Sequence, residues 1–224
     1  MKLTKTIAFF LCLWYIAPLH AGDLTLDADK RVEYHQKSEK IVAIGNAIAK
    51  KNGSSIKGDT LIGYRDSKSK DNFSKIEAFG NVVVKTPKTT LTARGSFKYF
   101  ADSLKIIATD NVSTTDAKGT KVSADLVTAY LTKDKSGTLE IDRIHFEKNI
   151  KIDSQGTVVT ADKGVYKAAA GKITLTENVT ISQNGNVLRG TKAETDLNSG
   201  ISKLLSDEPS GRISGVFKEK SKKD

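Results

Sequence analysis

The feature that most constrains this chain is a repeat that occurs five times, each time around an asparagine. An isoleucine stands five residues before every anchor, and apolar residues stand three before and one after it. These offsets are all odd, so with the strand period of two the apolar residues share one face if the alternation continues through the anchor. The sequence therefore predicts short strands with one dry face. The anchors are Asn46, Asn81, Asn111, Asn149 and Asn178.

The anchors themselves predict a tight turn. Asparagine tolerates the left-handed backbone conformation, and glycine, which precedes it at Gly45 and Gly80, tolerates it better. About ten residues after each anchor a second half-unit begins with an apolar residue followed by a small one, and this half-unit also occurs once before the first anchor. Five of the half-units end near a tyrosine, namely Tyr34, Tyr64, Tyr99, Tyr130 and Tyr166.

The spacing of the units indicates antiparallel pairing. Successive anchors are 35, 30, 38 and 29 residues apart. A regular parallel β-helix holds its rung length more closely, whereas antiparallel strands absorb such insertions in their turns. We therefore expect an all-β, mainly antiparallel coil of about five and a half strand-turn-strand repeats, with no linker that divides it.

Both ends of the chain differ in composition from the repeat. Lys2 and Lys5 precede an apolar run over 7–19, and Ala21 offers a small residue for cleavage, so we interpret 1–21 as a secretory signal peptide. A retained membrane anchor stays open as an alternative, although it would need roughly 18 to 20 apolar residues. We expect one domain over 22–217 and a solvated basic tail over 218–224, with a docking element as the alternative for the tail. The net charge of +10 favours anionic partners.

The chain lacks the residue patterns of an enzyme. No H-E-x-x-H, G-x-S-x-G or phosphate-binding glycine-rich loop is present, and the single cysteine, Cys12, lies in the expected signal peptide. We expect no catalytic residues, no metal site, no cofactor and no nucleic-acid partner. Arg94 and Thr191 replace aspartate in two units, which favours turn capping over a carboxylate ladder for calcium or acid catalysis. The aspartates at this position are Asp29, Asp59, Asp125 and Asp162.

The dry face has two interpretations that periodicity does not separate. Its side chains either fill a closed core, as in a β-solenoid scaffold or adhesin, or line an open groove for an apolar ligand. In the second case the lining residues are those at the odd offsets from the anchors. These are Ala47, Ala49, Ile76, Val82, Val84, Ile106, Val112, Ile144, Phe146, Ile150, Ile152, Ile173, Leu175, Val179 and Ile181.

Several segments resemble the OstA-like family. They are "DLTLDADK", "GNAIAKKNGSSIKGDTLIGY", "GNVVVKTPKTTLTARGSFKYF" and "ADKGVYKAAAGKITLTENVTISQNGNVLRGTKAE", which together span nearly all of the chain after 1–21. The resemblance implies a twisted, slightly open, V-shaped β-jellyroll in the periplasm of Gram-negative bacteria. Its apolar interior would shelter the acyl chains of lipopolysaccharide, that is, of its lipid A part. Head-to-tail stacking would bridge inner-membrane and outer-membrane lipopolysaccharide transport components.

Carried over by position, the family's apolar pair in the first strand falls on Leu24 and Leu26, and its aromatic interior positions on Phe146 and Tyr166. The chain departs from the family by about one extra repeat and by its basic tail. Two relatives of the same pathway compete with this assignment. The short hydrophobic segment disfavours the inner-membrane relative with a retained anchor, and the end at residue 224 disfavours the outer-membrane relative with a large barrel.

Overall fold

The fold was analysed in a computed structural model, which describes residues 24–66, 72–87, 89–116, 119–135, 137–154, 156–196, 201–206 and 213–216. The expected signal peptide and basic tail lie outside these residues. The described chain consists of strands and one short 3-10 helix, η1 (Gln36–Ser38). The all-β fold expected from the repeat is therefore confirmed.

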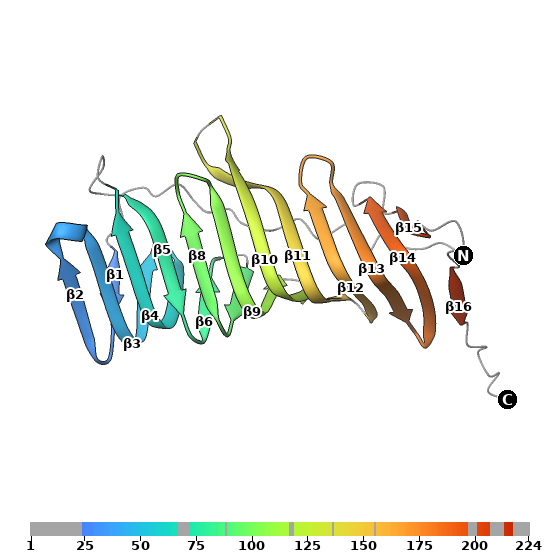
Figure 1. The fold of residues 1–224 in the computed structure, drawn as a ribbon, viewed down its shortest axis with the longest axis horizontal. Coiled ribbons are helices and arrows are strands. Elements are labelled where there is room, and N and C mark those ends of the chain that lie inside the picture. Colours follow the sequence, from blue (N-terminus) through green and yellow to red (C-terminus); the bar gives the residue numbers. More distant parts are fainter. Residues whose placement is uncertain are drawn as a thin grey trace.

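The strands form one continuous sheet. They are β1 (Thr25–Asp27), β2 (Arg31–His35), β3 (Lys40–Lys51), β4 (Ser54–Arg65), β5 (Phe73–Phe79), β6 (Val82–Lys85), β7 (Thr89–Ala93), β8 (Ser96–Phe100), β9 (Lys105–Asp116), β10 (Lys121–Lys133), β11 (Leu139–Ser154), β12 (Thr157–Lys167), β13 (Lys172–Gln183), β14 (Asn186–Asp196), β15 (Ile201–Leu205) and β16 (Ser214–Val216). Every pairing between them is antiparallel. The order of strands along the sheet follows the sequence closely, so the molecule is elongated with β2 at one end and β15 and β16 at the other (Figure 1).

Each anchor asparagine lies at a crease that divides the sheet into two leaves. In β3, Ile44 pairs with Thr60 and Ala47 pairs with Gly58, so two residues of β3 oppose a single residue of β4. β10, β11, β12, β13 and β14 show register shifts at the equivalent points. The first leaf contains the residues before each anchor and is bounded by β2 and β15. The second leaf contains the residues after each anchor and is bounded by β1 and β16.

The crease has the left-handed backbone that the sequence predicts, but in pairs of residues. All five anchors have positive φ, between 43° at Asn46 and 53° at Asn178, and so does the residue before each. That preceding residue is glycine in two units only, and it is Asp110, Lys148 or Glu177 in the others. A left-handed residue costs roughly 1–2 kcal/mol unless its side chain forms local hydrogen bonds. Glycine before the anchor therefore indicates the left-handed pair in two units only, whereas the asparagine indicates it in all five.

The aspartates of the second half-units bridge neighbouring strands at this crease. The Nδ2 group of Asn46 donates to Asp29, Asn81 to Asp59, Asn149 to Asp125 and Asn178 to Asp162, over 2.5–3.3 Å. In the remaining unit the acidic side chain lies on the other strand. Arg94 replaces the aspartate, and it contacts Asp110, the residue before the anchor, at 3.5 Å. These aspartates therefore have a structural role, as expected, but they accept from the anchor side chain of a neighbouring strand, and turn capping stays a prediction.

Candidate functional site

The dry faces of both leaves share a single core beneath the crease. The residues one after each anchor are Ala47, Val82, Val112, Ile150 and Val179, and each is at most 1% exposed. On the first leaf, the residues three before each anchor are also buried, among them Phe146 and Leu175. These side chains belong to one hydrophobic cluster that extends along the sheet. The predicted lining residues nearest the crease are thus packed against one another.

Burial decreases away from the crease in the second leaf. The residues three after the anchors are half-buried, although they pair in register with the same neighbouring strands. Leu26 pairs with Ala49 and is half-buried, whereas Leu24 is 43% exposed. The interior is therefore closed at its base and less covered toward the rim of the second leaf, except at Leu91 and Val122, which pair with Val84 and Ile152 and are buried. The half-buried predicted residues here are Ala49, Val84, Ile152 and Ile181.

The interior of the first leaf opens toward its N-terminal end. Ile106, Ile144 and Ile173 are buried, whereas Ile76 is half-buried. Near the end, Val32 and Tyr34 of β2 are 52% and 51% exposed, although they pair with Ala43 and Ile41 of the interior row. These two residues belong to the dry face, and the sequence pattern had placed only Tyr34 in a repeat position.

An open depression of about 510 Å³ lies at this end. Its apolar walls come from both leaves, and charged groups stand at its edge. The hydroxyl of Tyr34 donates to Glu39 Oε2 at 3.0 Å, and this hydrogen bond raises the pKa of Tyr34. The depression therefore joins the apolar interior to the outside of the molecule. Its lining residues are Leu26, Val32, Tyr34, Glu39, Ile41 and Arg65.

Tyr166 is the largest fully buried side chain. It pairs with Ile144 and Ile173 on the two neighbouring strands and is 1% exposed. Its hydroxyl has no hydrogen-bond partner among the described residues, and burial raises the pKa of this group to about 12. A polar group buried without a partner costs about 1–3 kcal/mol. Tyr166 therefore places a polar group without a described partner inside a mainly apolar interior.

The repeated tyrosines divide between the two faces of the first leaf. Tyr99 pairs with Ile76 and Ile106, so it lies on the interior face with Tyr34 and Tyr166. Tyr64 and Tyr130 pair with lysines and an arginine and lie on the outer face. Tyr166 lies four residues after Asp162, whereas the other four tyrosines lie five residues after the aspartate or arginine of their half-unit and still divide between the two faces.

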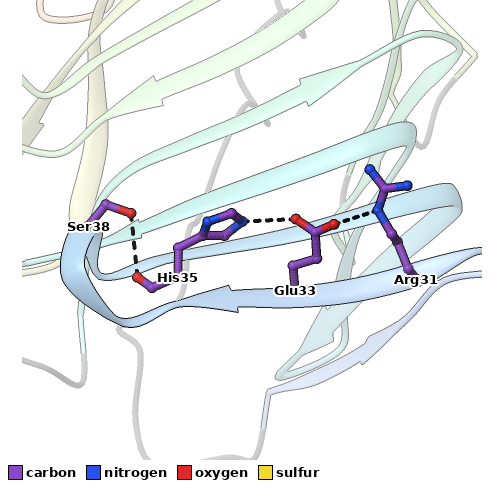
Figure 2. A network of polar contacts seen from close by, with 4 residues as sticks. All are labelled: Arg31, Glu33, His35 and Ser38. Atoms are coloured by element: carbon purple, nitrogen blue, oxygen red, sulfur yellow. Dashed lines mark hydrogen bonds and ion pairs between the residues drawn. The ribbon is translucent and has the colours of Figure 1, made fainter.

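The edge strand β2 presents a charged network on its outer side (Figure 2). Glu33 accepts from Arg31 Nε at 2.6 Å and contacts His35 Nε2 at 2.9 Å. The hydrogen bond from His35, followed by the charge of Arg31, outweighs desolvation and lowers the pKa of Glu33. Exposed edge strands can pair with other strands, and charges on them restrict which partners fit. The free edge of the first leaf is thus charged outside and apolar inside.

The described residues hold no group of three or more His, Cys, Asp or Glu side chains arranged to bind a metal ion. Among the same residues, no helix has the length and apolar character needed to cross a bilayer.

Comparison with known proteins identifies the class of chain that has this two-leaf, creased sheet. Residues 66–201 match the family described as "LptA/(LptD N-terminal domain) LPS transport protein". This match covers more than half of the 224 residues. The chain therefore belongs to this family of lipopolysaccharide transport proteins, which confirms the resemblance of its repeats.

Several solved structures resemble this fold, and one of them is LptH, the LptA homologous periplasmic component of the conserved lipopolysaccharide transport device from Pseudomonas aeruginosa. It shares 13% sequence identity, with a TM-score of 0.25 and coverage of 88% of this chain and 96% of that chain. No curated protein sequence matches the chain.

Proposed function

We propose that this protein is exported to the periplasm, where it shelters the acyl chains of lipopolysaccharide between its two leaves. The observation that carries the proposal is the continuous apolar interior, which is packed at the crease and less covered toward the rim and the N-terminal end. Membership of a lipopolysaccharide transport family supplies the ligand class.

The need for such an interior follows from the hydrophobic effect. Each acyl CH₂ group exposed to water costs about 0.8 kcal/mol, so a lipid with several acyl chains does not cross an aqueous compartment unsheltered. Aliphatic walls attract acyl chains without fixing their direction, which allows the lipid to slide. No bond is made or broken, and no catalytic group is needed. A partner in the inner membrane would supply the energy that loads the lipid.

The two ends of the sheet provide the contacts for a bridge. β2 and β1 leave unpaired edges at one end, and β15 and β16 do so at the other. Pairing the last strands of one copy with the first strands of the next is a head-to-tail contact, which extends without closing. The same edges would pair with related folds of inner-membrane and outer-membrane transport components. We propose that these contacts carry the apolar interior from copy to copy.

Site-specific photo-crosslinking in intact envelopes tests lipid binding. A photoreactive residue at Val84 would face the interior rim, and one at Val83 would face outward as the matched control, because successive residues of β6 alternate between faces. We expect lipopolysaccharide adducts at Val84 and none at Val83. Folded, exported protein with no adduct at either position would contradict the proposal.

A scaffold with a closed core is the second candidate, because the crease rows are almost completely buried. It differs in its response to interior substitutions, which would change stability without affecting any lipid contact. The crosslinking result at Val84 separates the two candidates, because only the groove brings an acyl chain to this position.

A further inference from the structure

The outermost row of the first leaf combines cations with aromatic rings. It lies on the outer face, at the rim farthest from the crease, next to the turns that run along the upper edge of Figure 1. Strand pairing places its members side by side across the sheet, although they come from distant parts of the sequence. We call it the rim row, and its members are Lys40, Tyr64, Lys75, Phe100, Lys105, Tyr130, Arg143, Lys167 and Lys172.

Cations and aromatic rings alternate over much of the rim row. From β3 to β11, a cation occupies every second strand and an aromatic ring occupies the strand between. Since neighbouring strands are about 4.8 Å apart, these cations recur roughly every 10 Å along the rim. Lys167 and Lys172 extend the positive charge onto the next two strands.

The aromatic rings hold several of these cations in place. Lys75 Nζ lies 3.9 Å from the centre of the Tyr64 ring, and Arg143 Cζ lies 4.2 Å from that of Tyr130. Lys105 Nζ approaches Tyr130 from its other neighbouring strand, at 5.6 Å. Such contacts contribute about 0.5–1 kcal/mol each at exposed sites. The cations are thus positioned before any ligand arrives.

Carboxylates neutralise the rim row only in part. Glu77 contacts Lys75 at 3.3 Å, and Asp142 contacts Arg143 at 2.7 Å. Among the described residues, Lys105 and Lys167 have no carboxylate within ion-pair distance. The hydrogen bond from Lys192 lowers the pKa of Glu194, and the charge of Lys172 contributes less; Asp196 of β14 pairs with Lys172 at the end of the row. An excess of positive charge remains over the middle of the row.

The line of alternating cations and aromatic rings distinguishes this row from its neighbours. The next outer row of the first leaf holds the Glu77–Lys98 ion pair, and its middle consists of Ile107, Thr128, His145 and Val165. The corresponding outer row of the second leaf carries Lys50, Lys85 and Lys121 before reaching Asp153, with serine and threonine between them and no aromatic ring. The first rim is therefore the more basic and the better ordered of the two.

We propose that the rim row binds the phosphorylated saccharide part of the glycolipid whose acyl chains occupy the interior. This inference rests on the proposed function. A lipid held between the leaves presents its anionic head at the mouth, and the rim row is the border of that mouth on the first leaf. Phosphate groups along a saccharide match a line of fixed cations, because charge-assisted hydrogen bonds are the stronger ones. The row therefore orients the head group while the acyl chains slide.

The experiment compares two triple variants of the full exported chain, in which equal numbers of charges are removed from the two leaves. The test variant carries Lys75→Gln, Lys105→Gln and Arg143→Gln. The matched control carries Lys50→Gln, Lys85→Gln and Lys121→Gln. The ligand is deacylated, phosphorylated lipopolysaccharide oligosaccharide, and its Kd is measured by calorimetry at low and physiological salt. Thermal unfolding confirms that both variants are folded.

We expect the test variant to bind the oligosaccharide roughly tenfold more weakly, since three exposed charge contacts contribute about 0.5 kcal/mol each. The control variant should change by less than about threefold, and added salt should weaken wild-type binding. Enzymatic removal of the phosphates should have the same effect as the test variant. Equal losses in both variants would show that only net charge matters and would overturn the proposal, as would failure of the wild-type protein to bind.

Two further measurements distinguish this inference from membrane binding by the same row and from the proposed interior site. If the test variant loses binding to phosphatidylglycerol vesicles but keeps its affinity for the oligosaccharide, the row contacts a membrane surface and the proposal is wrong. Photo-crosslinking at Val84 in the test variant reports the interior independently. If the test variant loses oligosaccharide binding but still forms acyl adducts at Val84, the result supports the rim row. If wild-type protein binds the oligosaccharide but forms no adducts, the result refutes only the proposed interior site.

Discussion

At the scale of single residues, the two polar features that matter most are the buried Tyr166 hydroxyl and the left-handed asparagines of the crease. The first is a polar group without a partner inside an apolar interior, and the second lets a strand bend while its neighbours remain paired. Each has a measurable cost or benefit, because a single substitution changes it without altering the strands around it.

Tyr166→Phe should stabilise the ligand-free protein by about 1–3 kcal/mol, because it removes a buried hydroxyl that lacks a described partner while it keeps the ring. Urea unfolding at neutral pH measures this difference. An unchanged or lower stability would indicate that the hydroxyl has a bound partner such as water.

The same substitution should change the response to alkaline pH. The folded state holds the pKa of Tyr166 at about 12, above its ordinary value of 10, so the folded state keeps a proton that the unfolded state loses. This contribution is complete below pH 10 and is lost as the pH rises from 10 through 12, by up to about 2 kcal/mol. The loss should be smaller in Tyr166→Phe and should persist in Tyr130→Phe, a matched change on the outer face.

The crease predicts different outcomes for two substitutions of Asn149. Asn149→Ala should cost about 1–2 kcal/mol, because alanine is strained at φ 52° and the hydrogen bond to Asp125 is lost. Asn149→Gly loses the same hydrogen bond but accepts the backbone conformation, so it should cost less. Urea unfolding of both variants distinguishes strain from hydrogen bonding, and equal losses would exclude strain as the cause.

At the scale of elements, the edge strands decide whether copies assemble. Among the described strands, β2 pairs only with β3, and its inward residues Val32 and Tyr34 are about half exposed. Similar exposure occurs at the other end, where Val216 of β16 is 59% exposed. Large apolar side chains at both free ends fit the proposed head-to-tail contact, which would cover them.

Val32→Asp should weaken self-association by at least tenfold, because burying an apolar side chain of this size contributes about 1.5–3 kcal/mol and a buried carboxylate opposes it. Light scattering across a concentration series measures the association. Lys85→Gln, in the middle of the second leaf, serves as the control and should leave the association unchanged. Wild-type-like assembly of Val32→Asp would exclude this end as an interface.

At the scale of the whole molecule, the gradient of burial separates stability from binding. Val82, beside the crease, is 1% exposed, while Val84 on the same strand and face is half-buried. Side chains at the base hold the leaves together, and those toward the rim are accessible to an acyl chain. A groove protein requires both, because leaves that separate completely would expose the core.

Substitution of Val82 should therefore mainly change stability, and substitution of Val84 should mainly change lipid contact. Val82→Ala should lower stability by about 2 kcal/mol through the cavity it leaves, whereas Val84→Ala should cost less than about 1 kcal/mol. A bulky photoreactive residue should give lipid adducts at Val84 and mainly unfold the protein at Val82. Thermal unfolding and crosslinking of the same preparations test this, and equal destabilisation at both positions would mean that the interior is closed up to its rim.

The repeat alone was sufficient to predict the fold class, the antiparallel pairing, the left-handed backbone at each asparagine and the face on which the apolar residues lie. These properties are local, because strand alternation and the left-handed preference of asparagine act over a few residues. The tight turn expected at each anchor was wrong in four units, where the bend lies inside one continuous strand, and only Asn81 separates two strands. The candidate lining residues accordingly fall on one interior, with Leu24 at its exposed end. Their contact with lipid remains a prediction.

The tertiary structure decided which tyrosines enter that interior. The inward Val127 is the second residue after Asp125, but the inward Phe97 is the third residue after Arg94, since Gly95 adds one at the crease. One added residue reverses every side chain that follows, so Tyr99 points inward and Tyr130 outward.

The rim row depends in the same way on pairing between strands that are distant in the sequence. Its cations are scattered from Lys40 to Lys172 and show no periodicity along the chain. They become a line only when the register of successive strand pairs is known. Local sequence therefore determined the strands and their dry face, and the long-range register, together with packing between the leaves, determined what lies on each rim and how far the interior is closed.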